Sequence, residues 1–391
     1  MYIETNASAG TSSAEIDLLL EPLIGRGPDL LVVSCSCDFN IHKLRDAVLP
    51  IDAKATHGST SCLGVMTNQG MFGRSGDGIG YFALWDPEGA YGTANSSIKD
   101  DAGQAARDAT RAALSRAGRP GEAPHLIWVS ASPGQEEAII SGIESVVGEG
   151  IPIVGGSAAD NTVAGTWTIF GCDGIMSDGV QITVLFPSTP LTSEFQSGYA
   201  PSGHSALVTR AEGRRLYTLN NRPAVEVYEE LTGLSFMSDR PAFPTSILSQ
   251  SSFHPLGFEL SKVAGVPYFL LMHAAILHND GSIDFFADVE EGKMLHFMNG
   301  APEGLKNRAG RIARRSKEQL AGREAAGALV IYCAGCMLSI TDLMDDVASG
   351  VDKALEGAPF LGVFTFGEQG HALNQKNSHG NLMISCVTFS A

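Results

Sequence analysis

Hydrophobic positions along the chain form short runs of β-branched and aromatic residues, and a helical pattern follows the first of them. Leu30–Cys35 is such a run, and apolar residues at helical spacing follow in Ile41–Val48. A turn rich in Gly and Ser comes next, and residues 78–84 form a returning apolar run. Strands that are apolar throughout are typical of a sheet covered on both faces. The pattern therefore predicts a β-α-β-turn-β unit.

The same order of elements recurs twice. Residues 125–147 and 328–355 each begin with an apolar strand and continue with a helical pattern. The three copies then reach their turns at Gly58, Gly155 and Gly362. Because self-similarity marks a repeated architecture, we expect an α/β fold of repeated β-α-β-β units forming mixed sheets. The three glycines should occupy equivalent positions.

A different pattern lies between the second and third copies. Residues 205–219 have the signature of a hairpin, and residues 223–231 that of a helix with proline in its first turn and Gly233 after its end. Residues 268–298 are rich in strand-forming residues, and residues 304–320 predict a helix with a basic, solvated face.

The expected domain organisation has three parts. Residues 1–29 are a lead-in whose short helix is capped by Ser12 or Ser13 ahead of Glu15. An N-terminal domain spans residues 30–220 and a C-terminal domain spans residues 221–391.

Composition and charge narrow the classes of function. The 26 basic and 43 acidic residues give a net charge of −17, which opposes binding to nucleic acids. The sequence shows neither a membrane-spanning apolar stretch nor a signal peptide, so we expect a cytoplasmic protein. Seven cysteines are too few, and odd in number, for a disulfide framework.

Cysteines supply one candidate metal site. Cys333 and Cys336 form a CxxC motif after a predicted strand, which provides half of a tetrahedral site. Cys35 and Cys37 follow the corresponding strand of the first copy. If the copies pack symmetrically, the four thiols approach one another, although small residues filling a crowded strand end explain the pattern more simply.

Strand-end glycines beside acidic residues supply a second candidate site. The backbone N–H groups of Gly155, Gly156 and Ser157 could hold a carboxylate, while Asp160 and Glu368 could receive an ammonium group. This combination suits an amino acid as ligand. The alternative is that the glycines are present only because the backbone conformation requires them. Nucleophile-elbow, Walker A and zinc-protease motifs are missing from the sequence, so we expect no enzymatic activity.

Several segments, taken in their order along the chain, resemble the FIST family of intracellular signal-transduction sensors. These segments are Ile153–Asp160, Val208–Gly213, Asn221–Tyr228, Val289–Gly292, Phe360–Phe364, Phe366–Gly370 and His379–Gly380. The resemblance covers about residue 30 to the end and implies a FIST N domain followed by a FIST C domain.

The family resemblance implies a function. Stand-alone proteins of this architecture look like the NosP group, which implies non-covalent haem b, nitric oxide as ligand and a separately encoded histidine kinase as partner. We expect this haem-based nitric oxide sensor as the function. The alternative, implied by the broader family, is a haem-free sensor for a small molecule such as an amino acid. Both leave homo-oligomerisation open.

Haem would need an axial ligand in apolar surroundings. We rank His371 and His379 first because they flank the turn at Glu368, and His273 next because its sequence neighbours are the most apolar.

Overall fold

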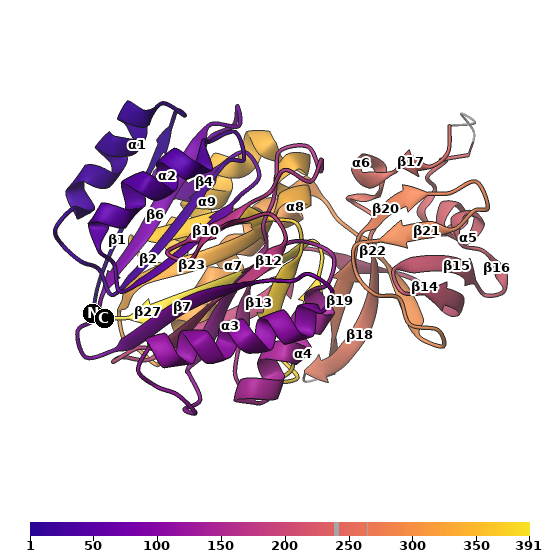
Figure 1. Cartoon of the computed structure of the whole chain (residues 1–391). Coiled ribbons are helices and arrows are strands. Elements are labelled where there is room, and N and C mark those ends of the chain that lie inside the picture. Colours follow the sequence, from indigo (N-terminus) through magenta and orange to yellow (C-terminus); the bar gives the residue numbers. More distant parts are fainter. Residues whose placement is uncertain (238–241, 264) are drawn as a thin grey trace.

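The computed structural model describes residues 1–237, 242–263 and 265–391. Figure 1 shows a larger body that contains both chain termini, and a smaller body, coloured salmon to orange, that projects from one end. In the described residues the strands form four sheets, three of six strands and one of nine. The three six-stranded sheets build the larger body and the nine-stranded sheet builds the smaller one.

The larger body consists of three units with the same order of elements: a strand, a helix, two parallel strands joined by helix, a hairpin and a closing strand. Unit 1 comprises β1 (Tyr2–Ala9), α1 (Ser13–Leu20), β2 (Leu30–Cys35), α2 (Ile41–Val48), β3 (Ala55–Thr60), β4 (Val65–Thr67), β5 (Gly70–Phe72) and β6 (Gly78–Trp85). Unit 2 comprises β7 (Ala90–Ser97), α3 (Ala102–Arg116), β8 (Leu126–Ala131), α4 (Glu136–Val147), β9 (Ile153–Ser157), β10 (Ile169–Gly171), β11 (Gly174–Met176) and β12 (Gly179–Phe186). Unit 3 comprises β13 (Leu191–Ser197), α7 (Pro302–Glu318), β23 (Ala325–Cys333), α8 (Ala334–Ser339), α9 (Met344–Ala354), β24 (Phe360–Thr365), β25 (Glu368–His371), β26 (Asn377–Gly380) and β27 (Met383–Ser390).

The smaller body, which we call the insertion, interrupts unit 3 between β13 and α7. Its elements are β14 (Ala200–Glu212), β15 (Arg215–Leu219), β16 (Arg222–Pro223), α5 (Ala224–Thr232), β17 (Thr245–Ser246), α6 (Leu248–Ser251), β18 (Leu256–Val263), β19 (Val266–Met272), β20 (Ala274–Leu277), β21 (Ile283–Phe285) and β22 (Met294–Asn299). The boundary expected at residue 220 falls between β15 and β16, which pair with each other. The insertion therefore continues across that boundary.

Strand register shows that the three units are equivalent. Gly58 pairs with Val33 in the parallel pair β2–β3, Gly155 pairs with Val129 in β8–β9, and Gly362 pairs with Val330 in β23–β24. The expectation that these glycines occupy equivalent positions is confirmed. The third copy, whose spacing along the chain is longer, accommodates the extra helix α8 before α9.

The units exchange hairpins in a ring. The hairpin of unit 1 adds to β24 of unit 3, that of unit 2 adds to β3 of unit 1, and that of unit 3 adds to β9 of unit 2. Each six-stranded sheet is therefore completed by residues from another unit.

Backbone hydrogen bonds close the same ring at the ends of the second strands. The N–H of Cys62 donates to Phe364 O at 3.0 Å, and the N–H of Ala159 donates to Thr60 O at 3.0 Å. The N–H of Phe366 donates to Ser157 O at 3.1 Å. These bonds satisfy polar groups that would otherwise be buried without partners where three strand ends converge.

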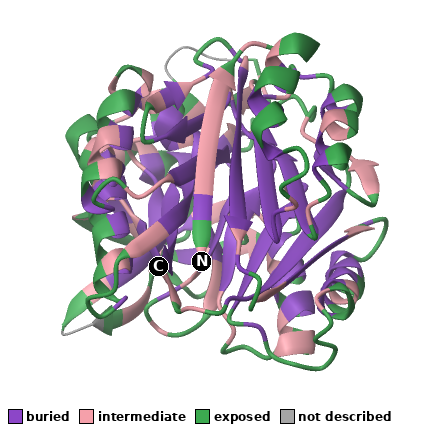
Figure 2. Ribbon diagram, turned by 90° about the vertical axis from the view of Figure 1, so that its left-hand side faces the viewer, coloured by how far each residue is buried: buried purple, intermediate pink, exposed green. Residues whose placement is uncertain are grey.

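The sheets enclose one shared apolar core and are covered outside by helices. Leu30, Trp128 and Leu329, one from each unit, belong to the same buried cluster. The outer faces carry separate clusters under α1 and α2, under α3 and α4, and under α7 and α9. Figure 2 shows buried strands through the middle of the larger body and exposed residues concentrated on its peripheral helices and loops. Burial on both faces explains why the strands are apolar throughout.

The N-terminal residues differ from the expectation of a lead-in. Ser12 does cap α1, with Glu15 completing a capping box. However, β1 pairs along its whole length with β6, and α1 covers the sheet of unit 1. Residues 1–29 therefore contain the first strand and helix of unit 1.

Close backbone approach makes Gly155 a test of the unit core. A Cβ at this position would lie 1.9 Å from Val129 O, a backbone atom that cannot move without breaking the sheet. We expect Gly155→Ala to lower the free energy of unfolding by about 3 kcal/mol or more, as in severe overpacking. Denaturant unfolding measures this change. Gly150→Ala is the control, because nothing lies within 4 Å of a Cβ there, and a comparable loss in both variants would contradict the interpretation.

Candidate functional site

A cavity of about 350 Å³ lies where units 2 and 3 meet the insertion. Its wall is largely apolar and mixes residues from all three parts. The lining residues are Pro133, Val163, Trp167, Leu248, Ser249, Ser252, Phe253, His273, Phe286, Cys333, Gly335, Leu338, Ser339, Thr365, Phe366 and Asn381. The rim is open to solvent, since Val163 and Leu338 remain 45% and 47% exposed. The volume falls in the range of small-molecule sites.

Two pairs of aromatic rings form part of the wall. Trp167, from the loop between β9 and β10, meets Phe366 edge-on with ring centroids 6.3 Å apart. Phe286 and His273, both from the insertion, meet with centroids 6.1 Å apart at an interplanar angle of 69°. Such walls favour planar or apolar ligands.

Two buried polar residues, His273 and Asn381, are joined at the wall. The backbone N–H of His273 donates to Asn381 Oδ1 at 3.1 Å, and the backbone N–H of Asn381 donates to Leu271 O at 2.9 Å. Asn381 Nδ2 is buried and has no hydrogen-bond partner among the described residues. An unpaired buried donor is costly, so this amide has capacity for one further acceptor.

His273 is held as a neutral imidazole. Burial lowers the pKa of His273 to about 4, against a weaker opposing effect of the Leu248 carbonyl. Nε2 lies 3.2 Å from Leu248 O, which can only accept, so Nε2 carries the proton and Nδ1 keeps a free lone pair. Of the three predicted axial histidines, His273 is the one that lines this cavity.

His371 and His379 lie elsewhere. His371 is part of the β25–β26 hairpin and its ring nitrogens face Asn377 and Gln375 at 3.0 and 3.4 Å. His379 is buried, and its Nε2 lies 3.1 Å from Phe286 O, behind the cavity wall. The turn at Glu368 is a hairpin that adds to unit 2, so closeness to it in sequence does not bring either ring to the cavity.

The strand-end residues predicted to bind an amino acid are occupied by internal hydrogen bonds. Gly155 and Gly156 pair with β25, and Ser157 Oγ donates to Glu136 Oε1 at 2.7 Å. The Asp160 carboxylate accepts backbone N–H bonds from the loop that follows it, and these outweigh burial and hold its pKa below the usual value. These polar groups maintain the loop structure.

Glu368 is a fully buried carboxyl beside the cavity wall. Its oxygens accept hydrogen bonds from Thr365 Oγ1 and from the N–H of Met383, both at 3.0 Å. Burial raises the pKa of Glu368 well above its usual range, and Cys333 adds to the effect. A carboxyl whose pKa is raised by burial in this way favours its neutral form, which is unsuited to pairing with an ammonium group.

The four candidate cysteines are not gathered into one site. In register Cys35 corresponds to Tyr332, so Cys333 lies one position further along its strand than Cys35 does. Within the described ranges, groups of three or more His, Cys, Asp or Glu side chains placed to hold a metal ion are absent. Cys333 lines the cavity, while Cys336 is buried with its Sγ 3.6 Å from Tyr199 Oη, and Cys37 is partly exposed.

An ion-pair cluster joins the insertion to unit 2 behind the cavity. Arg214, in the β14–β15 turn, contacts Glu136 and Glu137 at 2.7 and 2.8 Å. Burial raises the pKa of Glu136, but the charges of His379 and Arg214 and hydrogen bonds from Ser157 and Arg214 outweigh it, so the net pKa is lowered. The ion pair between this carboxylate and Arg214 therefore attaches the insertion to unit 2.

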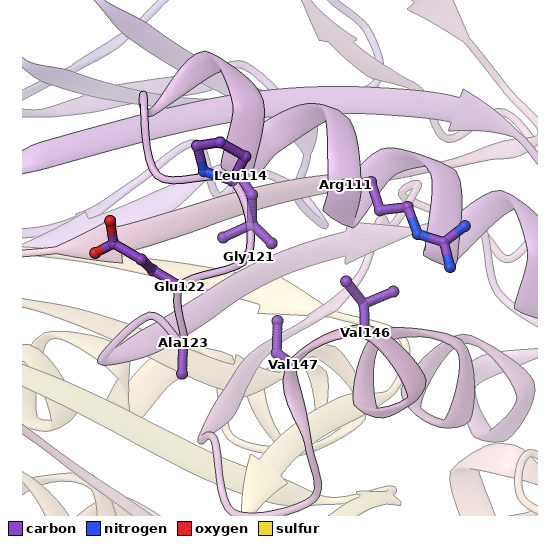
Figure 3. A pocket seen from close by; sticks show the side chains of 8 residues that line it. Arg111, Leu114, Gly121, Glu122, Ala123, Val146 and Val147 are labelled. Atoms are coloured by element: carbon purple, nitrogen blue, oxygen red, sulfur yellow. The ribbon is translucent and has the colours of Figure 1, made fainter.

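A second cavity, of about 320 Å³, lies outside the sheets between the ends of α3 and α4. Figure 3 shows Arg111 and Glu122 on opposite sides of it, with Leu114, Val146 and Val147 between them. Its polar side chains do not converge, and none of the residues selected from the sequence lines it. The cavity at the insertion is the better candidate.

Three residues of the wall were not predicted from the sequence: Trp167, Phe286 and Asn381. Trp167 and Asn381 lie in loops before strands, and Phe286 directly follows a short strand. Trp167 could have been noticed as a large aromatic residue between two threonines, Thr166 and Thr168, in a predicted loop. Nothing in the local sequence distinguishes Asn381.

The low pKa of His273 predicts how stability depends on pH. The unfolded imidazole takes up a proton near pH 6.5, whereas the folded one resists protonation down to about pH 4. Protons therefore favour the unfolded state, and stability falls as the pH drops from 6.5 to 4. His273→Gln should reduce this slope by about 1.4 kcal/mol per pH unit, measured by denaturant unfolding at several pH values. His125→Gln, at an exposed position, should leave the slope unchanged; equal slopes in all three proteins would show that His273 is not buried neutral.

None of the helices within the described residues is long and apolar enough to cross a membrane.

Comparisons with known proteins identify the family. Residues 29–222 match the FIST N domain and residues 224–371 match the FIST C domain. Uncharacterized proteins of Mycobacterium bovis and Mycobacterium tuberculosis are each 25% identical over 236 residues, which is 59% of this chain and 58% of theirs, so the chain spans less than two thirds of these relatives. A cyanuric acid hydrolase from A. caulinodans aligns over 100% of this chain and 99% of its own, with 10% identity and a TM-score of 0.40, a likeness too low to support any functional inference. The two domain matches together cover most of the sequence, and the chain belongs to the FIST family, whose domains are associated with sensing in signal transduction.

Proposed function

We propose that this protein is a cytoplasmic sensor that works without haem. It binds a small molecule in the cavity between units 2 and 3 and the insertion. The observation that carries the proposal is that one cavity is lined from two bodies. His273 and Phe286 come from the insertion, while Trp167, Phe366 and Asn381 come from the units. A ligand touching both bodies has different contacts when they move apart, which is the condition for shifting a conformational equilibrium.

The junction behind the cavity supplies a route for the signal. Phe286 lines the cavity with its side chain, and its backbone oxygen faces His379. His379 in turn belongs to the charge environment of Glu136, which pairs with Arg214 of the insertion. A ligand that displaces Phe286 would therefore change the contacts that hold the insertion to unit 2. The output we propose is contact with a separate signalling protein, with a histidine kinase as the partner that the family resemblance implies.

The composition of the wall bears on the choice of ligand. Among the described lining residues there is no Asp, Glu, Lys or Arg. A free amino acid would bring two charges into this wall without partners, which is costly. If the sensor contains no haem, its ligand is therefore better described as a small molecule of low charge than as an amino acid.

Haem b is the second candidate, and His273 favours it. A neutral imidazole, anchored through one nitrogen to a carbonyl and surrounded by apolar side chains, is the kind of axial ligand that haem iron takes. His273 would hold the iron through Nδ1, and the propionates would have to reach the open rim, since the described wall offers them no cation. When bound, haem would supply an iron atom able to bind nitric oxide.

A cavity-filling substitution tests the main proposal. Ser249 lies on α6 at the exposed edge of the cavity, and Ser249→Trp should occupy the space without disturbing the core. A thermal-shift screen of cell metabolites should then yield compounds that raise the Tm of the wild type but not of Ser249→Trp. Gln250→Trp is the matched control, because Gln250 is exposed on the same helix but does not line the cavity, and it should respond like the wild type. Compounds that stabilise Ser249→Trp as strongly as the wild type would place the ligand elsewhere.

Titration with hemin decides the second candidate. If haem binds at His273, a Soret band develops in the wild type, His371→Ala and His379→Ala but is lost or displaced in His273→Ala. A protein that develops no Soret band with hemin excludes this candidate and leaves the haem-free sensor. A band that persists unchanged in His273→Ala removes His273 as the ligand.

A further inference from the structure

We propose that a groove between α4, β26 and the insertion is the docking site for a signalling partner, and that the partner segment bound there is basic and amphipathic. This inference rests on the proposed output by protein contact. It adds the surface that makes the contact and the chemistry of the segment that binds to it.

The groove has a volume of about 270 Å³ and is separate from the ligand cavity. One side is formed by α4 of unit 2 and by β26 from the hairpin of unit 3, and the other side is formed by the insertion. Figure 1 shows α4 beside β18 and β19 of the insertion. The three parts of the molecule that meet at the ligand cavity therefore also meet at this groove.

Apolar side chains of the insertion form the floor of the groove. Phe258 and Leu270 are cross-strand partners in the β18–β19 pair, and Leu260 and Met272 lie beside them. Phe258 and Leu260 are only half-buried. A protein-binding site typically has an apolar centre surrounded by a polar rim, and this floor supplies such a centre.

Carboxylates form the rim, and none of the described lining residues is Lys or Arg. The side chains of Glu137, Asp288 and Glu290 are 34%, 55% and 68% exposed. Glu144, the fourth carboxylate, is half-buried. A cation approaching from solvent can therefore reach this rim.

The nearby cations do not neutralise the rim. Arg214 is shared by three carboxylates, among them Glu137 at 2.8 Å and Asp288 at 3.5 Å. Burial and the charge of Glu137 raise the pKa of Asp288, and Arg214 opposes this only in part. Glu144 accepts a hydrogen bond from the uncharged Asn377 amide at 2.9 Å. Positive charge brought by a partner would relieve the repulsion between these carboxylates.

The carboxylates are distributed around the groove and do not converge on one point. Glu144 belongs to α4 of unit 2, whereas Glu290 belongs to the insertion and contacts the exposed Lys293 at 3.5 Å. In the part of the chain that the structure describes, three or more such side chains are nowhere placed to hold one metal ion. A segment with several Lys or Arg residues around an apolar side chain complements both the rim and the floor, whereas a single ammonium group does not.

The groove and the ligand cavity share a wall. Met272 lines the groove and the next residue, His273, lines the cavity; Phe286 lines the cavity and the next residue, Ala287, lines the groove. His379 also lines the groove, and its Nε2 lies 3.1 Å from Phe286 O. A ligand that shifts Phe286 would therefore alter the groove, which links binding of the ligand to binding of the partner.

Fluorescence anisotropy with two labelled peptides tests the inference on the ligand-free protein. The Leu/Lys peptide repeats the sequence Leu-Lys-Lys-Leu-Leu-Lys-Leu, and the Ser/Lys peptide has serine in place of every leucine. The Leu/Lys peptide should bind the wild type about tenfold more tightly or better, because only its side chains can cover the apolar floor. Equal affinities of the two peptides would overturn the amphipathic assignment.

Reversal of two rim charges provides the variant. Glu144→Lys/Glu290→Lys should lower the affinity for the Leu/Lys peptide about tenfold or more, since like charges then face each other. Glu88→Lys/Glu318→Lys is the matched control, because both residues are exposed, neither lines the groove and the net charge changes equally. The control should change the affinity by less than about threefold. Equal losses in both variants would show that the peptide responds to net charge and would overturn the assignment of the groove.

Leu260→Asp separates docking from general attraction between opposite charges. The variant adds a carboxylate and removes part of the apolar floor, so docking predicts that the Leu/Lys peptide binds about threefold more weakly or worse. General attraction predicts unchanged or tighter binding, and that result would overturn the proposal. If Leu260→Asp does not fold, the rim variant and its control still decide the matter.

Two further results would overturn this inference and leave the proposed ligand cavity intact. One is failure of the Leu/Lys peptide to bind the wild type. The other is a wild-type dimer, detected by sedimentation, that dissociates in Glu144→Lys/Glu290→Lys, because the groove would then bind a second copy of the chain. The metabolite screen with Ser249→Trp decides ligand binding without any peptide, so the two proposals fail independently.

Discussion

The architecture depends on the ring of contacts through which each unit completes the sheet of another. Three hairpins are exchanged, and three backbone hydrogen bonds join the ends of β3, β9 and β24. A unit separated from the others would expose a sheet edge and an apolar inner face, both of which are unfavourable in water. The shared core, to which all three units contribute, follows from the same arrangement. The close approach of strands in this ring also leaves no room for a side chain at Gly156 of unit 2, where a Cβ would lie 2.4 Å from Thr365 Cγ2 of unit 3.

The insertion converts this symmetric arrangement into one with a distinct site. It enters between β13 and α7 of unit 3 and places His273 and Phe286 opposite the loops of unit 2 and the strand ends of unit 3. The equivalent connections in units 1 and 2 lead directly from strand to helix, so the cavity forms once in the described chain. A site between a rigid body and an attached one is suited to sensing, because occupancy and relative position are linked.

Much of the fold could be predicted from sequence, because it depends on local patterns. Burial on both faces makes the strands apolar throughout, and the glycines at 58, 155 and 362 mark equivalent positions, although they lie within β3, β9 and β24 and not in turns as the sequence had suggested. The exchange of hairpins could not be predicted, since pairing between strands far apart in sequence leaves no local signature. Among the site residues, the apolar neighbours of His273 correctly indicated burial, but the position of His371 and His379 depends on which sheet receives their hairpin. The proposed thiol cluster required Cys35 and Cys333 to be equivalent, and a shift of one residue along the strand is invisible without the register.

The central claim is that the three units form a single interlocked body to which the insertion is attached. Native-state hydrogen exchange, followed by mass spectrometry at increasing denaturant concentration, tests it most directly. The account predicts that amides of β2–β3, β8–β9 and β23–β24 exchange through one common opening with the same free energy and denaturant dependence, while the insertion is free to open at lower energy. Exchange of one unit through a separate, less stable opening, with the other two still protected, would contradict it.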